Sequence, residues 1–346
     1  MKLFNTLLLS STLFFIACGT TPNNSEIEQS SKKKIETKLS TIFTDTDFTL
    51  LAKSEKNGTF SYNLGNSSPS TLYRSGSTSK WVTATVILSL VKEGVLSLDD
   101  HPQTYIPNWN SSGNLSKITL KDLLTFTSGL TKEPLCLALK SYNFENCVEN
   151  IANKNKNAKV VGEEFHYGAN HLQVAGLMAI KASGKSSWQE LFEDFKKETN
   201  LFPTAKYDLP SLKNPRLSAG MHWNAKEYLA FLEALYNKNI LTPQLITMMT
   251  TDQLNRKNVG NSPAKFGMKE DWHYGFGTWI ECHAPINNCT KTTKVSSPGI
   301  YGAYPFIDYE HHYYGVVARE GKLGTFTKGY EIFNQVSKNL EEWAEE

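Results

Sequence analysis

The feature that most constrains the fold of this chain is a strongly apolar segment, Trp81–Leu90, which belongs inside a hydrophobic core. Its pattern predicts a helix that continues to Glu93 and ends at Gly94, because glycine is favoured just after a helix. Ser77 and Lys80 stand at the head of this helix, three residues apart, so their side chains share one face. The sequence therefore predicts a serine hydroxyl and a lysine amine in contact at the entrance to a buried helix.

This Ser-x-x-Lys pair predicts nucleophilic acyl-transfer chemistry. A hydroxyl becomes a good nucleophile when a base takes its proton, and an amine serves as that base once burial or another cation lowers its pKa. The same spacing occurs at Ser30, Ser31 and Ser262, but in polar segments, so the apolar context distinguishes Ser77. The alternative is that Ser77 only caps the helix and Lys80 extends to the surface.

The composition is that of a globular enzyme with one large domain or two closely packed ones. Of the 346 residues, 40% are hydrophobic and 20% are charged, which allows a large core. The net charge of +2 and the lack of a basic stripe with interleaved aromatics predict no nucleic-acid partner. The sequence has no zinc-ligand spacing and no His-Glu-x-x-His motif, so we expect neither a metal nor another cofactor.

Residues 1–18 have the pattern of an export signal, with a lysine, an apolar stretch and a small-residue cleavage site at Cys18. The apolar stretch of 14 residues is too short to span a bilayer, which takes about 20. The segment resembles a bacterial lipoprotein signal, which implies lipidation of Cys18 and an envelope protein anchored to a membrane, facing the periplasm or the outside. Because Phe15 replaces the usual leucine, cleavage as a plain secretory signal is the alternative. The polar residues 19–34 are expected to form a flexible tether.

Cysteine usage fits an exported chain. Besides Cys18, the four cysteines fall into two local pairs, Cys136 with Cys147 and Cys282 with Cys289. Four cysteines allow three pairings, and the local one is the simplest, so we predict these two disulfides. Four reduced, buried thiols are the alternative, which the oxidising conditions outside the cytoplasm disfavour.

Residues 35–346 predict one α/β (α+β) domain whose sheet is built from both ends of the sequence. Sheet-forming patterns occupy 35–76 and 270–346, and a large helical region, 77–269, is inserted between them. The turn Lys56-Asn57-Gly58 joins the first two strands as a hairpin. The expected strands are 48–52, 59–62, 274–280, 304–308 and 313–318, with a short helix at 34–44 and a last helix at 330–345.

The chain carries five motifs in a fixed order: Arg74–Pro107, which contains Ser77-Thr78-Ser79-Lys80; Ile118–Leu130, which ends in Thr-Ser-Gly-Leu; Phe165–Tyr167, followed by Gly176 and Gly184; Ser218–Gly220; and Tyr274–Gly277. In this order they resemble the serine β-lactamase-related hydrolases, which include class C β-lactamases, D-aminopeptidases, esterases and low-molecular-weight penicillin-binding proteins. The resemblance covers about residues 45–340. It implies a β-lactamase/transpeptidase-like fold, with an antiparallel sheet, flanking helices and the inserted helical region.

The resemblance implies roles for several of these residues. Ser77 is the expected nucleophile, and Tyr167 is expected to exchange protons with the nucleophile and the leaving group. A free phenol has a pKa of about 10, so we expect the charge of Lys80 to stabilise the phenolate. The alternative is that Tyr167 is only a core residue. The family's Tyr-x-Asn motif has alanine here, and Asn170 either holds a substrate amide or caps the helix 171–183.

A third element of the family is a strand beside the cleft with Lys-Thr-Gly or His-x-Gly, and its best match is Ser297-Pro298-Gly299. Gly299 lets a substrate approach the strand, and Pro298 predicts a sheet edge. The Ile300 N–H is expected to join the Ser77 N–H as an oxyanion hole. An ordinary turn is the alternative interpretation of Ser-Pro-Gly.

Ser297 stands where the family has a cation that faces substrate carboxylates. A serine donates one hydrogen bond but carries no charge, which favours an ester or a neutral amide as substrate. Lys291 and Lys294 lie close in sequence and are the alternative sources of a positive charge.

These expectations describe an exported, lipid-anchored serine hydrolase that forms an acyl-enzyme on a small-molecule or peptide-like ester or amide, esterase-like or D-amino-acid-amide-like. A peptidoglycan DD-peptidase or a β-lactamase is the second hypothesis. A cell-surface binding protein that keeps the fold without turnover is the third, because the tyrosine and glycine motifs both depart from the family pattern.

Overall fold

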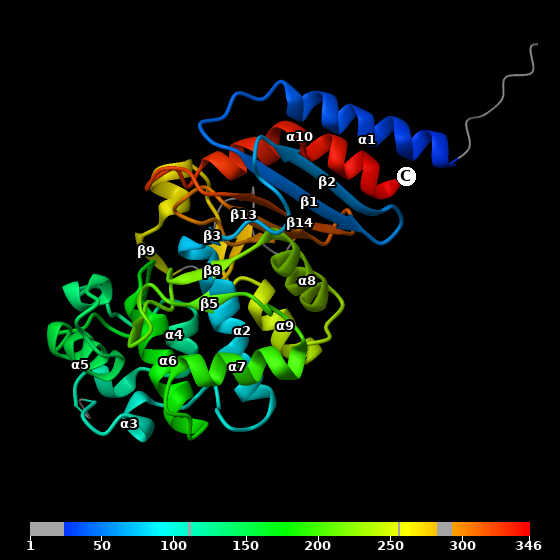
Figure 1. Cartoon of the computed structure of the whole chain (residues 1–346). Helices are drawn as coiled ribbons and strands as arrows, with labels where there is room; N and C mark the ends of the chain where they lie inside the picture. The colour runs from blue at the N-terminus through cyan, green and yellow to red at the C-terminus, as the bar shows by residue number, and fades with distance from the viewer. Residues whose placement is uncertain (1–23, 110–111, 255–256, 282–292) are drawn as a thin grey trace, which may run out of the picture.

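The sheet of this protein is assembled from both ends of the chain (Figure 1). The computed structural model describes residues 24–109, 112–254, 257–281 and 293–346. Antiparallel strands pair in the order β10-β11-β12-β13-β14-β1-β2, which confirms that the N-terminal hairpin joins the C-terminal strands. The strands are β1 Phe48–Ser54, β2 Gly58–Leu64, β10 His273–Tyr274, β11 Trp279–Glu281, β12 Lys294–Ser296, β13 Tyr304–Asp308 and β14 Tyr313–Arg319.

Helices cover both faces of this sheet. Helices α1 (Asn24–Ser40) and α10 (Lys328–Glu345) lie over one face, and α8 (Ala225–Tyr236) packs against β1 and β14 on the other (Figure 1). Every residue of β14 is buried as a result. Leu50 in β1 faces Val317 in β14, so the two chain ends meet in the most buried part of the sheet.

Helix α1 packs against α10 through residues four apart in sequence. Ile35 and Leu39 are fully buried, and Ser31 is nearly so. The Ser31 hydroxyl donates a hydrogen bond to the Glu346 carboxylate, which ties the start of the described chain to its end.

The tether expected over residues 19–34 is therefore wrong from Asn24 onward. The helix begins at Asn24, ten residues before the expected start at Lys34, and ends at Ser40. Its polar sequence suggested a solvated segment, but packing against α10 overrides that local preference. None of the described helices is long and apolar enough to cross a membrane. The predicted export signal and Cys18 lie outside the described residues.

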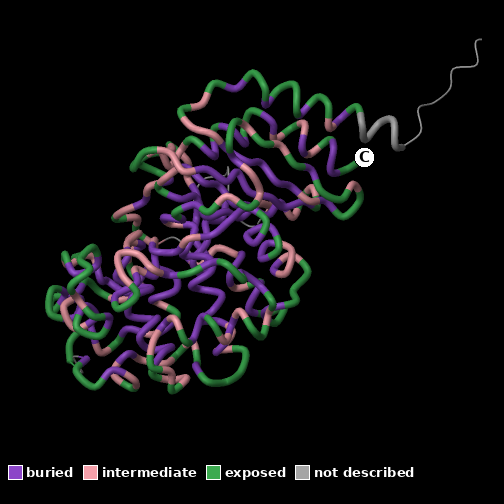
Figure 2. The backbone as a smooth tube through the Cα atoms, in the orientation of Figure 1, coloured by how far each residue is buried: buried purple, intermediate pink, exposed green. Residues whose placement is uncertain are grey.

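Helix α2 (Ser79–Lys92) runs through the centre of the inserted region, as its apolar sequence predicts. It is buried without interruption from Ser79 to Leu88, and α6 (Asn170–Ala182) packs against it (Figure 2). The other helices around it are α3 Pro102–Tyr105, α4 Leu120–Leu124, α5 Phe144–Lys154, α7 Trp188–Thr199 and α9 Pro243–Thr250.

Short strands interrupt the helical region, which the sequence pattern did not show. They form a three-stranded sheet in the order β3-β8-β5 and the pairs β4-β9 and β6-β7. Strands of two to four residues carry too little hydrophobic alternation to be recognised. They are β3 Tyr73–Arg74, β4 Glu164–His166, β5 Lys206–Tyr207, β6 Pro210–Ser211, β7 Asn214–Pro215, β8 Met221–Trp223 and β9 Asn258–Asn261.

The single strand expected over 274–280 is wrong, because the chain turns back within it. Strands β10 and β11 pair with each other across a turn that contains Gly277 at a φ of +73°. A Cβ added at Gly277 would lie 2.6 Å from the Ala84 Cβ and 2.8 Å from the Lys80 carbonyl oxygen. The turn is thus packed directly on the first part of α2, and only glycine fits there.

The structure contains the predicted disulfide between Cys136 and Cys147, with a Cα–Cα distance of 5.5 Å. It joins the turn Leu135–Ala138 to helix α5. Cys282 and Cys289 lie outside the described residues, so their pairing stays a prediction.

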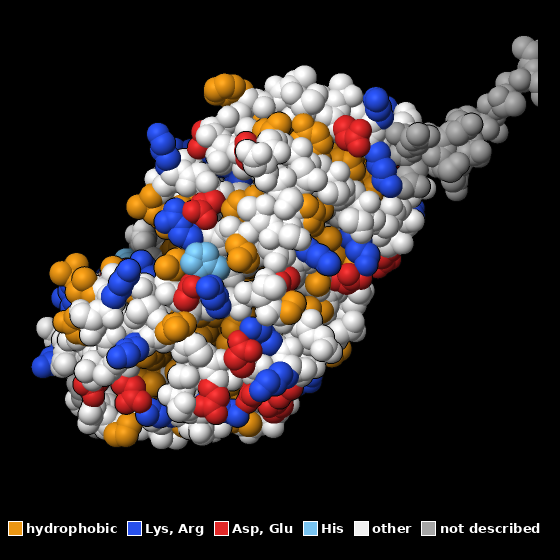
Figure 3. Space-filling view, in the orientation of Figure 1, with side chains coloured by type: hydrophobic (Ala, Val, Ile, Leu, Met, Phe, Trp, Pro, Cys, Tyr) orange, Lys and Arg blue, Asp and Glu red, His pale blue; other side chains and the backbone are white. Residues whose placement is uncertain are grey.

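Charges of both signs are interspersed over the surface. Figure 3 shows lysine and arginine side chains alternating with acidic ones across this face of the molecule. The sequence likewise balances 36 basic residues against 34 acidic ones. Such a surface has little net field to attract a polyanion over long distances.

Candidate active site

The side chains of Ser77 and Lys80 meet at the start of α2. A 3-10 turn, Gly76–Thr78, precedes the helix and places residues three apart above one another. The Lys80 Nζ lies 2.9 Å from the Ser77 Oγ and donates a 3.0 Å hydrogen bond to the Ser218 carbonyl. Lys80 is only 4% exposed whereas Ser77 is half-buried, so the hydroxyl is accessible and the amine is enclosed. Lys80 does not extend to the surface, and Ser77 is not the residue that caps α2.

Burial lowers the pKa of Lys80 from an ordinary value of 10.5 to about 7. The positive charge of Arg216 lowers this pKa further, and the carboxylate of Glu133 opposes the change. Near neutral pH a large fraction of Lys80 is therefore the free amine. A neutral amine 2.9 Å from the Ser77 hydroxyl is able to accept its proton.

Tyr167 follows strand β4 and closes over the lysine. The Lys80 Nζ lies 4.5 Å from the centre of the Tyr167 ring, and Trp279 stacks on that ring at 5.1 Å. The Tyr167 backbone is fixed by Asn261, whose carbonyl accepts from Tyr167 N at 2.9 Å and whose Nδ2 donates to Tyr167 O at 2.7 Å. The phenol is thus held against both Ser77 and Lys80.

Burial raises the pKa of the Tyr167 phenol, although hydrogen bonds with Ser77 and Trp279 and the charge of Arg216 work in the opposite direction. We expected Lys80 to be a cation that stabilises a phenolate. The structure instead favours a protonated phenol beside an amine that is partly neutral near pH 7. The sequence could not show this, because burial of both groups in one site is a tertiary property.

A buried histidine, which the sequence did not single out, supports this part of the site. The His171 Nε2 donates a hydrogen bond to the His166 carbonyl, so in the neutral ring its Nδ1 accepts one from the Ser128 hydroxyl, each at 2.8 Å. It stacks on Phe126 with the ring centres 4.7 Å apart, and burial lowers its pKa to about 3. His171 is therefore a neutral structural group that joins the Thr-Ser-Gly-Leu motif to the end of β4, directly before Tyr167.

The segment after β12 approaches the Ser77 turn closely, as expected. A Cβ at Gly299 would lie 2.4 Å from the Ser75 carbonyl oxygen, and one at Gly76 would lie 2.9 Å from the Ile300 nitrogen. Within the described part of the chain the Ile300 N–H has no hydrogen-bond acceptor. A backbone donor without a partner therefore lies beside Ser77.

Pro298 lies past the end of β12, which ends at Ser296 and is paired on both sides. Strand β12 itself is therefore not a sheet edge, but the predicted edge concerned the segment Ser297–Gly299. The neighbouring strand β11 begins opposite Ser296, however, and leaves Pro298 unpaired on the side that faces the Ser77 turn.

Two expected substrate contacts are turned away from a substrate. The Ser297 side chain is buried, and its hydroxyl donates to the Ser77 carbonyl at 3.1 Å, so it braces the nucleophile turn. Asn170 is fully buried as the first residue of α6 and makes no capping bond. Its Nδ2 donates instead to the carbonyls of Leu130 and Lys132, at 3.0 and 3.1 Å.

Two charged residues that the sequence interpretation missed border this site. Glu133 accepts a hydrogen bond from the Ala169 N–H through Oε1, and its Oε2 lies 3.5 Å from the Arg216 Nη2. For Arg216 the sequence offers one sign of a role in the site, which is its position two residues before the Ser218–Gly220 motif. Lys294, an expected alternative cation, pairs with Asp308 at 3.5 Å instead.

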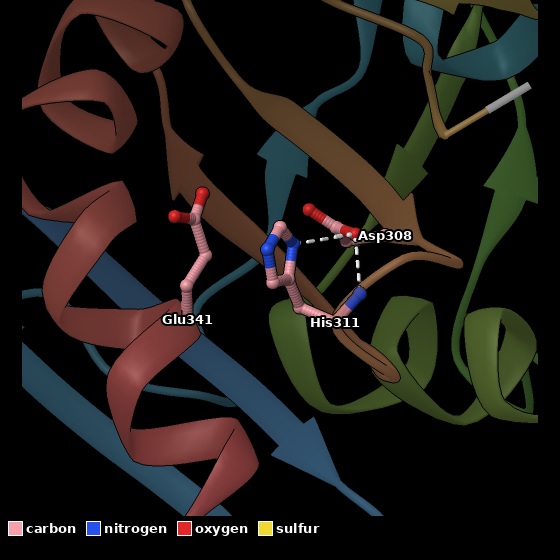
Figure 4. A group of neighbouring side chains, drawn as sticks. All are labelled: Asp308, His311 and Glu341. Carbon is pink, nitrogen blue, oxygen red and sulfur yellow. Dashed lines mark hydrogen bonds and ion pairs between the residues drawn. The ribbon is translucent and has the colours of Figure 1, made fainter.

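A group of possible metal ligands lies elsewhere, where Asp308, His311 and Glu341 bring side-chain ligand atoms within 4.8 Å of one another (Figure 4). One Asp308 oxygen already accepts from the His311 backbone at 3.0 Å and contacts its ring at 3.2 Å. The other oxygen pairs with Lys294. We interpret the group as an ion-pair and turn-stabilising cluster, because a lysine next to the carboxylate opposes a bound cation.

Comparisons with known proteins agree with this geometry. Residues 55–325 match the Beta-lactamase family. The teichoic acid D-alanine hydrolase of Staphylococcus aureus is 25% identical over 286 residues, which cover 78% of this chain and 67% of that protein.

Solved structures share the fold at lower identity. A putative β-lactamase from Bacteroides dorei has a TM-score of 0.73 at 22% identity. The superposition covers 92% of this chain and 99% of the β-lactamase chain. The D-amino acid amidase from Ochrobactrum anthropi has a TM-score of 0.67 at 15% identity, with coverage of 89% and 99%. These likenesses confirm the expected β-lactamase-like fold.

Proposed function

Because this chain belongs to the beta-lactamase family, we propose that it is a serine hydrolase that transfers an acyl group from an ester or amide to Ser77 and then to water. The observation that carries the proposal is the 2.9 Å contact between the Ser77 hydroxyl and the buried Lys80 amine, whose pKa is lowered to about 7. A nucleophile paired with a base of matched pKa is what acyl transfer requires.

In the first step, the neutral Lys80 amine takes the proton of Ser77 as Oγ forms a bond to the substrate carbonyl carbon. The carbonyl oxygen becomes an oxyanion, which the N–H groups of Ser77 and Ile300 stabilise. When the bond to the leaving oxygen or nitrogen breaks, the Tyr167 phenol donates its proton to that atom. The proton held by Lys80 then restores the phenol, so no net charge is created.

In the second step, water attacks the acyl-enzyme. The amine of Lys80, neutral again, removes a proton from the water as the new carbon–oxygen bond forms. Collapse of the tetrahedral intermediate breaks the bond to Ser77, and Oγ recovers its proton from Lys80. The products are a carboxylic acid and the original enzyme, and no cofactor is needed in either step.

For the substrate we propose a D-alanyl ester or a related acyl ester or amide of the cell envelope. The support is the similarity to the teichoic acid D-alanine hydrolase over 78% of this chain. A peptidoglycan peptidase or β-lactamase is the second candidate, because Arg216 supplies a cation near the site. A binding protein without turnover is the third, because Ala169 replaces the asparagine of the Tyr-x-Asn motif.

We also propose that the protein is exported and anchored through a lipid on Cys18. The disulfide Cys136–Cys147 supports an oxidising compartment outside the cytoplasm. Incorporation of a fatty-acid probe in cells, lost in Cys18→Ala and kept in Cys136→Ala, is the expected result. Labelling of the Cys18→Ala protein would contradict the anchor.

Active-site labelling tests the hydrolase function. A fluorophosphonate should label the purified protein but not Ser77→Ala, and mass spectrometry of proteolytic peptides should place the adduct on Ser77. Ser89→Ala is the matched control, because Ser89 lies on the same helix and bonds only within it, to the Val86 carbonyl at 2.7 Å. Labelling by a fluorescent penicillin instead would favour the peptidase or β-lactamase hypothesis, and labelling by neither reagent would favour the binding protein.

A further inference from the structure

We propose that Arg216, positioned by Glu133, is a specificity residue that binds an oxyanion, either a carboxylate or a phosphate, carried by the substrate beside its scissile bond. This inference rests on the proposed hydrolase function and adds a chemical feature of the substrate. It also replaces the expectation from sequence that the site has no cation for such a group.

The backbone of Arg216 is fixed relative to the catalytic lysine. Its N–H donates to the Leu209 carbonyl at 2.8 Å, and its carbonyl accepts from Gly220 N at 2.6 Å. A Cβ at Gly220 would lie 2.1 Å from the Leu209 oxygen, so this turn is packed closely against the Leu209 backbone. Two residues after Arg216, the Ser218 carbonyl accepts the hydrogen bond from Lys80. The Arg216 side chain therefore extends from a hydrogen-bonded segment that also accepts a hydrogen bond from Lys80, the proposed general base.

Glu133 connects the arginine to the tyrosine segment. One carboxylate oxygen accepts from Ala169 N, two residues after Tyr167, and the other lies 3.5 Å from the Arg216 Nη2. The segment that carries Glu133 is itself anchored by the buried Asn170 amide, which donates to Leu130 O and Lys132 O. The guanidinium is thus held between two segments that border the nucleophile.

The Arg216 head group retains capacity for a ligand. Its side chain is 34% exposed, and among the described residues its one ion pair, with Glu133, is long, at 3.5 Å. A guanidinium has five N–H donors in a planar fork that matches carboxylate and phosphate oxygens. Its Nε is buried and has no hydrogen-bond partner within the ranges that the structure describes. One loosely held carboxylate therefore leaves much of the fork unused.

The charge of Arg216 reaches the reacting groups. It lowers the pKa of both Lys80 and Tyr167, which sit at the nucleophile. By contrast, Ser297 is uncharged and hydrogen-bonded inside the protein, and Lys294 is occupied by Asp308 and stacked at 4.7 Å on the Phe333 ring. Of Ser297, Lys294 and Arg216, all in the described part of the chain, Arg216 is the residue positioned to bind a substrate anion.

The test compares three D-alanyl esters with the same acyl group, whose alcohols are ethylene glycol, 3-hydroxypropionate and glycerol 3-phosphate. We expect kcat/KM at low salt to favour an anionic ester over the neutral one, and Arg216→Gln to lower that ratio about fivefold to twentyfold. Arg216→Lys should retain part of the ratio, because it keeps the charge without the fork. The two anionic esters show whether carboxylate or phosphate is the preferred group.

Lys213→Gln is the matched control, because it removes an exposed cation three residues away that lines a different cavity. Its anionic-to-neutral ratio should equal that of the natural protein. An unchanged ratio in both Arg216 variants, with folding checked by circular dichroism, would overturn the inference while leaving the hydrolase function intact.

Failure of the proposed function would look different, as an absence of Ser77-dependent turnover on all three esters. In that case calorimetric binding of glycerol 3-phosphate decides the question without turnover. Binding to the natural protein that weakens at least fivefold in Arg216→Gln supports the anion site. Equal binding to both proteins, or none to the natural protein, overturns it.

Discussion

The two sides of this site are built in opposite ways. One side is the turn and helix α2, which carry Ser77 and Lys80 within four consecutive residues and are almost entirely buried. The other side gathers Glu133, Tyr167 and Arg216 from segments far apart in sequence, and its charged side chains are partly exposed. The serine–lysine pair therefore depends on local, enclosed geometry, whereas the proton donor Tyr167 and the charged residues beside it depend on long-range packing that few local signals reveal.

Removal of the nucleophile should have the largest effect on activity, and it tests whether the local side of the site carries out the reaction. Ser77→Ala should lower kcat/KM by about 10⁴-fold or more, because the covalent route disappears and only binding and oxyanion stabilisation remain. Thermal unfolding should change little, since Ser77 makes no capping bond. Ester hydrolysis at an undiminished rate would mean that the reaction occurs on another residue.

Removing the proton-handling groups should have the next largest effect. Lys80→Ala and Tyr167→Phe should each lower kcat by about 10²–10⁴-fold. The double variant should lose little more than the worse single variant, because residues that act as one unit are non-additive. Rate measurements on the three proteins check this, and independent, multiplying losses would place one residue outside the catalytic unit.

The third test addresses the segment after β12. Gly299→Ala should lower kcat by about 10²–10³-fold, because a Cβ 2.4 Å from the Ser75 oxygen would displace the Ile300 N–H from the oxyanion hole. Gly184→Ala is the control, since it introduces a side chain at positive φ into open space just after the C-terminal end of α6. Similar kinetics in both variants would remove Ile300 from the proposed mechanism.

A smaller effect should appear in the pH dependence. The pKa of Lys80 is lowered to about 7, so the neutral base accumulates as the pH rises through that value and kcat/KM for a neutral ester should rise with it. Below the pKa the rate should fall about tenfold per pH unit. Arg216→Gln removes a charge that depresses this pKa, so the rise should move to higher pH, while Lys213→Gln should leave it in place. A shift in the opposite direction would contradict the assigned base.

The smallest effect on activity is expected from the disulfide, which lies outside both sides of the site. Cys136→Ala with Cys147→Ala opens a short loop and should lower the free energy of unfolding by about 3 kcal/mol. The kinetic constants should stay within about twofold of the natural protein, since no catalytic group moves. Denaturant unfolding and ester hydrolysis on the same samples measure both. A large loss of activity without unfolding would show that the α5 region couples to the site.

Local patterns account for much of the fold. The apolar run of α2, the turn after Lys56 and the strands near both ends are each visible in a window of about ten residues. Errors arose where long-range contacts overrode local preference. The polar sequence before Lys34 is helical because it packs on α10, and the segment 274–280 turns because Gly277 meets α2.

The active site likewise divides into features set by local sequence patterns and features set by long-range contacts. The Ser77–Lys80 contact follows from a spacing of three residues at a helix start, so it was predictable. The protonation of Tyr167, the inward bonds of Ser297 and Asn170, and the approach of Arg216 depend on which groups are buried together. No single segment contains that information.

By itself, the amino-acid sequence determined the strands near both chain ends, the buried helix α2, and the pairing of a serine with a lysine at its head. Those features arise from residue patterns over short distances, where backbone geometry alone sets the neighbours. The tertiary structure decided the electrostatics of the site, because desolvation and the charges of Glu133 and Arg216 act through space rather than along the chain. It therefore decided the protonation states of Lys80 and Tyr167.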